Sequence, residues 1–218
     1  MMKRLIVCAL LAVMALGAVA LADDVVSFQK ILDASNALQT FSATIMMTQH
    51  SGKKASTIEF QFTYVPPTKM RIEYTAPKAL VGQLLIINGD QLYTYMPALH
   101  RSLHRTVSGD GGDEGKEMGF LYYFVNRSLS EFSQDYTISP VDGPEKYTYE
   151  YNGKEVSYDA YKVTLIGEGG KQIVWCDADS LVPIAIDIYD GDKLTIEIRV
   201  VDYEYNQTVP EAGFVIPD

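Results

Sequence analysis

Apolar and polar residues alternate along two neighbouring stretches, residues 57–65 and 69–76. One side of these stretches carries Ile58, Phe60, Phe62, Tyr64, Met70, Ile72 and Tyr74, and the other carries Thr57, Glu59, Gln61, Thr63, Lys69, Arg71 and Glu73. A period of two predicts β-strands with one buried and one solvated face. Pro66 and Pro67 cannot donate backbone hydrogen bonds, so the first strand must end there and the chain must reverse. The pattern therefore predicts an antiparallel hairpin with one apolar face.

The same period continues through most of the chain. Further strands are expected at residues 41–50, 82–87, 91–96, 101–107 and 136–141, and at alternating segments through Tyr147–Tyr151, 161–165, 173–175, 184–188 and 194–200. Asn88 and Gly89 form the strongest short hairpin signal of the chain. Near Val200 and Val201 the alternation changes phase, which predicts a β-bulge that bends the last strand.

Two segments depart from this period and predict helices. Residues 24–38 place apolar side chains three and four positions apart, and Asp23 or Asp24 could cap this helix. A second helix is expected at residues 114–132, after a stretch in which Gly109, Gly111 and Gly112 could serve as a hinge.

The count of elements sets the expected architecture. Eleven or twelve strands with two helices, no fixed repeat and no linker predict one mainly β domain. A continuous antiparallel sheet of this size must curl. We therefore expect a single curved antiparallel sheet that forms an incomplete, half-open β-barrel covered by helices.

The N-terminal residues 1–22 predict a secretory signal peptide. Lys3 and Arg4 precede an apolar run, and Ala20-Leu21-Ala22 is a small-residue cleavage site. Cys8 lies inside the run, so we expect no lipid anchor, and the mature domain would span residues 23–218 in the periplasm. Only Cys176 remains after cleavage, so no intramolecular disulfide is expected.

The mature chain is strongly acidic. Removing Lys3 and Arg4 from the 18 basic residues leaves 16 against 28 acidic ones, and the net charge moves from −10 to −12. Such a surface repels phosphate backbones, which argues against a nucleic-acid partner. We expect a monomer.

Several sequence blocks resemble the periplasmic outer-membrane lipoprotein carrier family, LolA and its LolB-like relatives. These blocks are F-x-F-x-Y-x-x-P at residues 60–67, K-M-R-I-E-Y-x-x-P at 69–77, I-I-N-G-D-x-L-Y-x-Y-x-P at 86–97, W-x-D at 175–177 and F-V-I-P at 214–217. The resemblance implies a hydrophobic cavity that shields the acyl chains of a lipoprotein, or another lipid, during transfer towards the outer membrane. It also implies an inner-membrane releasing transporter and an outer-membrane acceptor as partners. The family's lid-fastening arginine is replaced here by Val65.

Two sets of residues are therefore candidates for ligand contact. The cavity would be lined by Phe60, Phe62, Tyr64, Met70, Ile72, Tyr74, Trp175, Ile184, Ile186 and Ile188. The lid would present Met118, Phe120, Leu121, Tyr122, Phe124 and Val125 from the second helix. The alternatives are a filled core and an ordinary packing helix.

Other chemistry finds little support in the sequence. There is no G-x-S-x-G motif and no plausible nucleophile and base pair, so we expect no enzymatic activity. His100 and His104 lie four apart in a strand context without a carboxylate in register, and the loop of Asp187, Asp190 and Asp192 has Ile198 at position 12 in place of the glutamate of a calcium site. No cofactor or metal is expected. A second functional hypothesis is an envelope sensor that binds a protein or lipid signal on the same fold.

Overall fold

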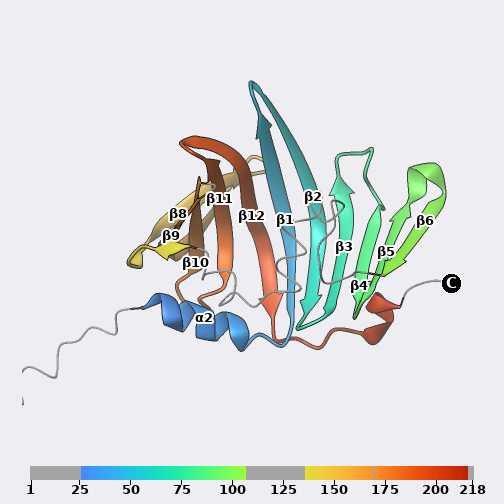
Figure 1. Cartoon of the computed structure of the whole chain (residues 1–218), viewed down its shortest axis with the longest axis horizontal. Coiled ribbons are helices and arrows are strands. Elements are labelled where there is room, and N and C mark those ends of the chain that lie inside the picture. The colour runs from blue at the N-terminus through green and yellow to red at the C-terminus, as the bar shows by residue number, and fades with distance from the viewer. Residues whose placement is uncertain (1–25, 107–135, 169, 216–218) are drawn as a thin grey trace, which may run out of the picture.

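The computed structural model describes residues 26–106, 136–168 and 170–215. In these residues twelve strands form one antiparallel sheet in the order β6-β5-β4-β3-β2-β1-β12-β11-β10-β9-β7, with β8 paired to β9 (Figure 1). The first and last strands, β1 and β12, are neighbours in the middle of the sheet. The end strands β6 and β7 do not pair with each other among the described residues, so the sheet is not closed. The predicted single curved antiparallel sheet is confirmed.

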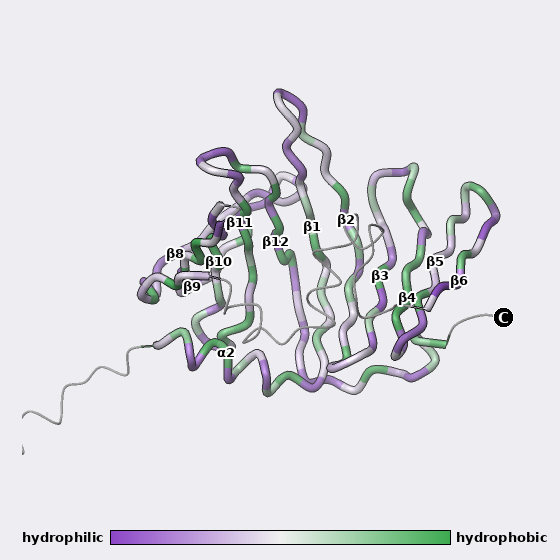
Figure 2. The backbone as a smooth tube through the Cα atoms, viewed as in Figure 1, coloured by the Kyte–Doolittle hydropathy of each residue, from purple (hydrophilic) through white to green (hydrophobic). Residues whose placement is uncertain are grey.

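The strands occur in the segments of the chain where the alternation predicted them, although their bounds differ. They are β1 (Phe41–Ser51), β2 (Lys54–Val65), β3 (Lys69–Ala76), β4 (Leu84–Asn88), β5 (Gln91–Met96), β6 (Arg101–Thr106), β7 (Thr137–Ile138), β8 (Asp142–Tyr151), β9 (Lys154–Gly167), β10 (Gly170–Asp177), β11 (Pro183–Asp190) and β12 (Lys193–Tyr205). Short 3-10 helices η1 (Pro97–Leu99) and η3 (Glu211–Phe214) lie outside the strands. Figure 2 shows hydrophobic and hydrophilic residues interleaved along these strands.

The strand register gives the sheet two chemically distinct faces. Residues paired across neighbouring strands lie on the same face. Phe62 pairs with Ala43 on one side and Ile72 on the other, whereas Gln61 pairs with Thr44 and Glu73. We call the side of Phe62 the apolar face and the side of Gln61 the polar face. The predicted facing of the β2–β3 hairpin is confirmed.

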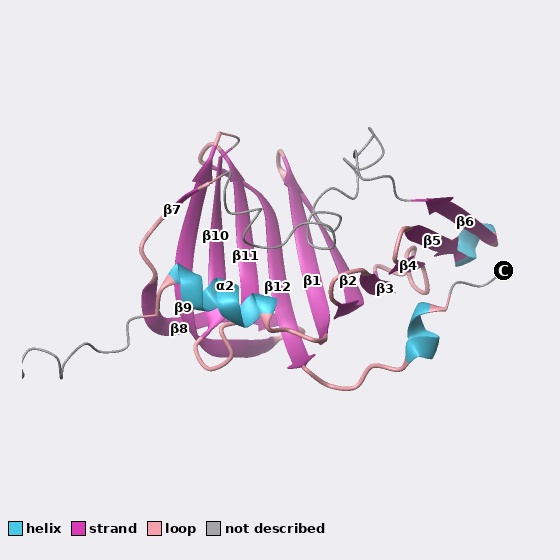
Figure 3. Ribbon diagram, turned by 60° about the horizontal axis from the view of Figure 1, so that its bottom comes forward, coloured by secondary structure: helices cyan, strands magenta, loops and turns pink. Residues whose placement is uncertain are grey.

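Helix α2 (Phe28–Asn36) covers one end of the apolar face (Figure 3). Its Ile31 packs with Val163, Leu165 and Cys176 of β9 and β10. The predicted cap at Asp23 or Asp24 is wrong: Ser27 is the N-cap, and its hydroxyl accepts a hydrogen bond from the Lys30 amide at 3.3 Å. Ser27 has extended backbone angles immediately before the first helical turn, the position from which a hydroxyl reaches the free amides.

The hairpin of β8 and β9 folds back over the polar face. Its Tyr151 hydroxyl donates to Glu59 on β2 at 2.8 Å, and its Tyr158 hydroxyl donates to the carbonyl oxygens of Val200 and Val201 on β12 at 3.3 and 3.2 Å. Tyr149 donates to the Val200 carbonyl as well. The predicted β-bulge is confirmed there, because Thr44 pairs with Asp202 and Ile45 with Val200, which leaves Val201 as the extra residue.

Helix η3 covers the polar face of β3 to β5. Phe214 is 2% exposed and packs with Ile86 and Tyr93. Lys69 pairs with Glu211 at 2.7 Å, and Arg71 donates to the Gly213 carbonyl. Val65 packs against this same cluster.

Two predictions fall outside the described residues. The signal peptide, residues 1–22, is one of them. The other is the helix 114–132 with its hinge glycines and its proposed lid residues Met118, Phe120, Leu121, Tyr122, Phe124 and Val125. Both remain predictions.

Candidate functional site

The apolar face forms a continuous layer across the middle of the sheet. Its side chains fall into rows that run from strand to strand through the pairing register. Three of these rows are Phe41–Tyr64–Met70–Ile87–Leu92, Ala43–Phe62–Ile72–Leu85 and Val200–Ile45–Phe60–Tyr74. A fourth, Ile186–Ile198–Met47–Ile58, extends the layer to β11.

Most of the sequence-predicted cavity residues lie in this layer. Met70, Ile72 and Ile184 are 0% exposed, Phe60 is 3% and Phe62 and Ile186 are each 8% exposed. Tyr64, Tyr74 and Ile188 are half-buried and pack against the same cluster. Ring contacts join neighbours within and between the rows, with centroids 6.1 Å apart for Phe41 and Phe62 in adjacent rows and 5.8 Å apart for Phe60 and Tyr74 in one row.

Trp175 also packs against this cluster, but the strand register places it on the other face of the sheet. Trp175 pairs with Ala185, whereas its neighbour Val174 pairs with Ile186 of the apolar layer, so Trp175 lies on the polar face. There its ring centroid lies 4.6 Å from that of Tyr147 in the folded-back hairpin, and the Lys162 ammonium lies 5.3 Å from the indole centroid. Its indole nitrogen is buried with no hydrogen-bond partner among the described residues.

The half-buried tyrosines of the apolar layer are uncharged. Burial raises the pKa of Tyr64 and of Tyr74, because desolvation disfavours the phenolate. Both side chains are therefore neutral at physiological pH. Their rings supply apolar contact area and their hydroxyls can still form hydrogen bonds.

A cleft of about 670 Å³ lies at the β9–β10 turn, next to the end of the apolar layer. It is lined by Tyr136, Gly167, Glu168, Gly170, Lys171, Gln172, Ile188 and Tyr189. The Gln172 amide donates to the Tyr136 hydroxyl at 2.9 Å. Gly170 has φ +133, and a Cβ there would overlap the Tyr189 carbonyl, so only glycine fits this turn. Ile188 is thus the one predicted cavity residue that also lines this cleft.

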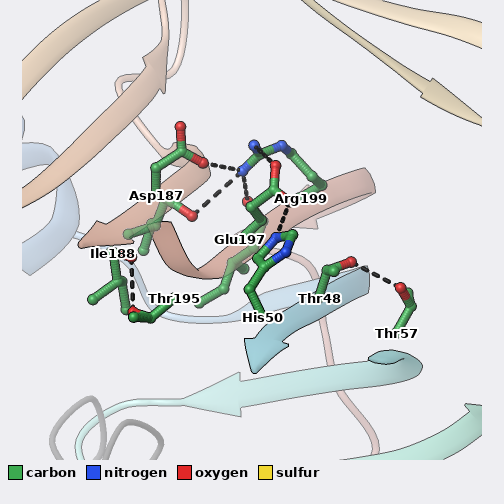
Figure 4. Close-up of polar contacts among 10 residues, drawn as sticks. Thr48, His50, Thr57, Asp187, Ile188, Thr195, Glu197 and Arg199 are labelled. Carbon is green, nitrogen blue, oxygen red and sulfur yellow. Dashed lines mark hydrogen bonds and ion pairs between the residues drawn. The ribbon is translucent and has the colours of Figure 1, made fainter. Parts of the chain in front are cut away.

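A buried charge network occupies the polar face behind the layer (Figure 4). Arg199 is 8% exposed and lies 2.7 Å from the Asp187 carboxylate and 2.8 Å from Glu197. The other Glu197 oxygen lies 2.6 Å from His50. The Tyr147 ring covers the guanidinium at 5.7 Å. Sequence reasoning missed this network, although Asp187, Glu197 and Arg199 all fall on the polar side of the strand alternation.

The residues considered for metal binding lie apart from one another. His104 packs edge-on against Tyr93 at 4.8 Å, and His100 is the exposed residue that ends η1. Asp190 and Asp192 flank the β11–β12 turn, while Asp187 pairs with Arg199. No group of three or more His, Cys, Asp or Glu side chains within the described part of the chain is arranged to hold a metal ion. In the same residues no helix is long and apolar enough to cross a membrane.

Comparisons with known proteins address the fold. No protein-family model matches the chain, and no curated protein matches its sequence. An uncharacterized conserved protein from Thermus thermophilus is 14% identical with a TM-score of 0.55, over 87% of this chain and 94% of that chain. A chain of the Pseudomonas aeruginosa MucA/MucB complex is 10% identical with a TM-score of 0.50, over 87% of this chain and 59% of that one.

A LolA superfamily protein from Nitrosomonas europaea is matched over 88% of this chain and 98% of its own, at 13% identity and a TM-score of 0.42. Identities this low bear on the fold alone. The architecture itself is one antiparallel sheet that stays open, with a helix packed at one end of its apolar face. The fold of the chain is therefore a single open antiparallel sheet, as the strand alternation predicted, and it is similar to the folds of the Thermus and Pseudomonas chains.

Proposed function

We propose that the protein is an exported lipid carrier whose apolar face shields the acyl chains of a lipoprotein or of another lipid. The observation that carries this proposal is the continuous apolar layer from β11 to β5 in a sheet that does not close. Among the described residues, α2 is the one α-helix on that face, and it packs at the β9–β10 end. The layer consists of aromatic and aliphatic side chains, a composition suited to contact with hydrocarbon.

The energetics favour such a shield. Exposing an acyl chain to water costs about 0.8 kcal/mol per methylene, so a chain of ~16 carbons costs on the order of 12 kcal/mol. An uncharged layer of aromatic and aliphatic side chains recovers this free energy without a specific hydrogen bond. The proposed route runs through the periplasm, with the signal peptide of residues 1–22 directing export. A membrane transporter that loads the carrier and an acceptor that unloads it would be its partners, and no catalytic step is assigned.

Native mass spectrometry of the gently extracted protein tests the proposal. We expect adducts with the mass of a lipid that disappear after extraction with organic solvent. Clean apo protein under several detergent-free extraction conditions would contradict the proposal.

A matched pair of variants tests whether the apolar face is the binding surface. Ile58→Asp places a carboxylate on the apolar face at a half-buried position, and Thr57→Asp places one on the opposite face of the same strand. We expect Ile58→Asp to lose the lipid adducts and Thr57→Asp to keep them. Thermal unfolding of both variants would check that the fold survives. Equal lipid retention in both would show that the ligand lies elsewhere.

The second candidate function is protein recognition in the envelope. It is favoured by the likeness to a chain of the MucA/MucB complex, in which one protein binds another. On this hypothesis the apolar face would bind a protein segment. Adducts of peptide mass in place of lipid mass would favour it.

A further inference from the structure

The apolar layer ends at an edge strand that carries positive charge. Among the described residues, β6 is the last strand of the sheet on this side, and all six of its residues are exposed. Residues 91–106, which form β5, η1 and β6, include Arg101, Arg105 and two histidines but no aspartate or glutamate. In a chain with a net charge of −10, this edge is an exception.

The register places both arginines on the apolar face. Arg105 pairs with Leu92, which ends the apolar row that begins at Phe41, and Leu103 pairs with Thr94. Arg101 pairs with Met96. The residues between them alternate to the other face, where His104 packs against Tyr93. A chain lying along the row Phe41–Tyr64–Met70–Ile87–Leu92 would therefore reach a guanidinium at its β6 end.

We propose that the ligand is an amphiphile with an anionic headgroup, and that Arg101 and Arg105 bind this headgroup where the apolar layer ends. The inference rests on the proposed lipid-carrier function and adds the chemical class of the lipid. Guanidinium groups form charge-assisted and often bidentate hydrogen bonds with phosphate and carboxylate oxygens. The two arginines are four residues apart on one strand, about 13 Å along the backbone. Because both side chains are long, their guanidinium groups can approach each other more closely than their backbones do.

The exposed apolar residues beside the arginines fit the same ligand. Leu103, between them, is 39% exposed, and Leu99 in η1 is 61% exposed. An anion is repelled by most of this acidic surface, so the β6 edge is the favoured place for a negative headgroup. The headgroup would stay in contact with water while the hydrocarbon lies on the layer, which spares the charge the cost of burial.

Lipids of equal chain length provide the test. Binding of palmitoyl lysophosphatidylglycerol, which is anionic, is compared with that of palmitoyl lysophosphatidylcholine, which is zwitterionic, below their micelle concentrations. We expect the wild-type chain to bind the anionic lipid about three- to tenfold more tightly at low salt, as suits exposed ion pairs with bidentate geometry. The preference should shrink in 1 M salt, where such charges are screened.

The variant R101Q/R105Q should bind both lipids equally, with the affinity for the zwitterionic lipid unchanged. The control K146Q/K154Q removes the same charge from exposed positions on the β8–β9 hairpin and should keep the preference. Inorganic phosphate at the same concentration as the lipid and at constant ionic strength should leave the preference intact, and its displacement of the lipid would identify a free-phosphate site instead.

The experiment distinguishes failure of the headgroup inference from failure of the carrier proposal. Equal binding of both lipids by the wild-type chain would overturn the headgroup inference and leave the carrier proposal standing. Equal loss of preference in both double variants would also overturn it, because the effect would then come from net charge. Failure to bind either lipid would overturn the inference together with the proposed function.

Discussion

The two faces of the sheet bury different kinds of side chain. The apolar face is uncharged along its rows, and its central residues, Met70 and Ile72, are fully buried. The polar face carries Arg199 at 8% exposure, held by two carboxylates and covered by a tyrosine ring. Hydrocarbon contact has no directional requirement, whereas a buried guanidinium needs partners at defined positions.

This difference suggests that the two faces of the sheet have different roles. A layer held by non-directional contacts can exchange one apolar neighbour for another at little cost, which suits a surface that binds and releases lipid. The polar face joins β11, β12 and the β8–β9 hairpin through bonds of fixed geometry. We therefore expect substitutions on the two faces to differ in kind, and three predictions test this.

The largest effect is expected from a charge in the centre of the apolar layer. Ile72→Glu puts a carboxylate at a position that is 0% exposed, so we expect a loss of more than about 4 kcal/mol in the free energy of unfolding. Thr63→Glu, on the adjacent strand and the other face beside Arg71, should change stability by about 0.5 kcal/mol or less. Urea unfolding followed by tryptophan fluorescence measures both. Similar losses in the two variants would refute the assignment of faces.

The next effect concerns the buried guanidinium. Arg199→Ala leaves Asp187 and Glu197 without their cation, and we expect a loss of about 3 to 5 kcal/mol. Arg71→Ala removes a more exposed ion pair with Glu73 on the same face and should cost about 1 kcal/mol or less. The same urea measurement applies. A small loss for Arg199→Ala would mean that water, and not the guanidinium, satisfies the two carboxylates.

The smallest effect is a change in the alkaline stability profile. Burial raises the pKa of Tyr147 to about 12, an effect that nearby Arg199 opposes. An unfolded tyrosine ionises near pH 10. The stabilisation from keeping Tyr147 neutral is therefore complete below pH 10 and is lost as the pH rises towards 12. Tyr147→Phe retains the ring on Trp175 and should make unfolding less steeply dependent on pH in this range. An unchanged slope would show that Tyr147 does not contribute.

Local patterns predicted much of the apolar face. The alternation in residues 57–76 assigned Phe60, Phe62, Met70 and Ile72 correctly, because one buried face in a strand imposes a period of two. Even the bulge at Val201 left a phase change in the sequence. These features depend on neighbours within a few residues.

Trp175 shows where such reasoning stops. Ile173, Val174, Trp175 and Cys176 are all apolar, so alternation cannot choose their face, and the register shifts between Trp175 and Cys176. The Arg199 network was missed for a related reason. Its partners come from three strands and a folded-back hairpin, and no local pattern places that hairpin over β12. The tyrosines at 147, 149 and 151 were a signal of a second buried surface that went unassigned.

The pairing of β1 with β12 has a consequence for how the chain folds. Strands β1 to β6 and β8 to β12 can each form from hairpins between consecutive strands, and such local contacts form early. The two sets become one sheet only when β12, near the end of the chain, aligns with β1 near its beginning. As the chain emerges, one edge of β1 therefore stays unpaired until β12 has followed. Until then its apolar residues are exposed to other chains, and a chaperone that covers this edge would protect the newly made protein from aggregation.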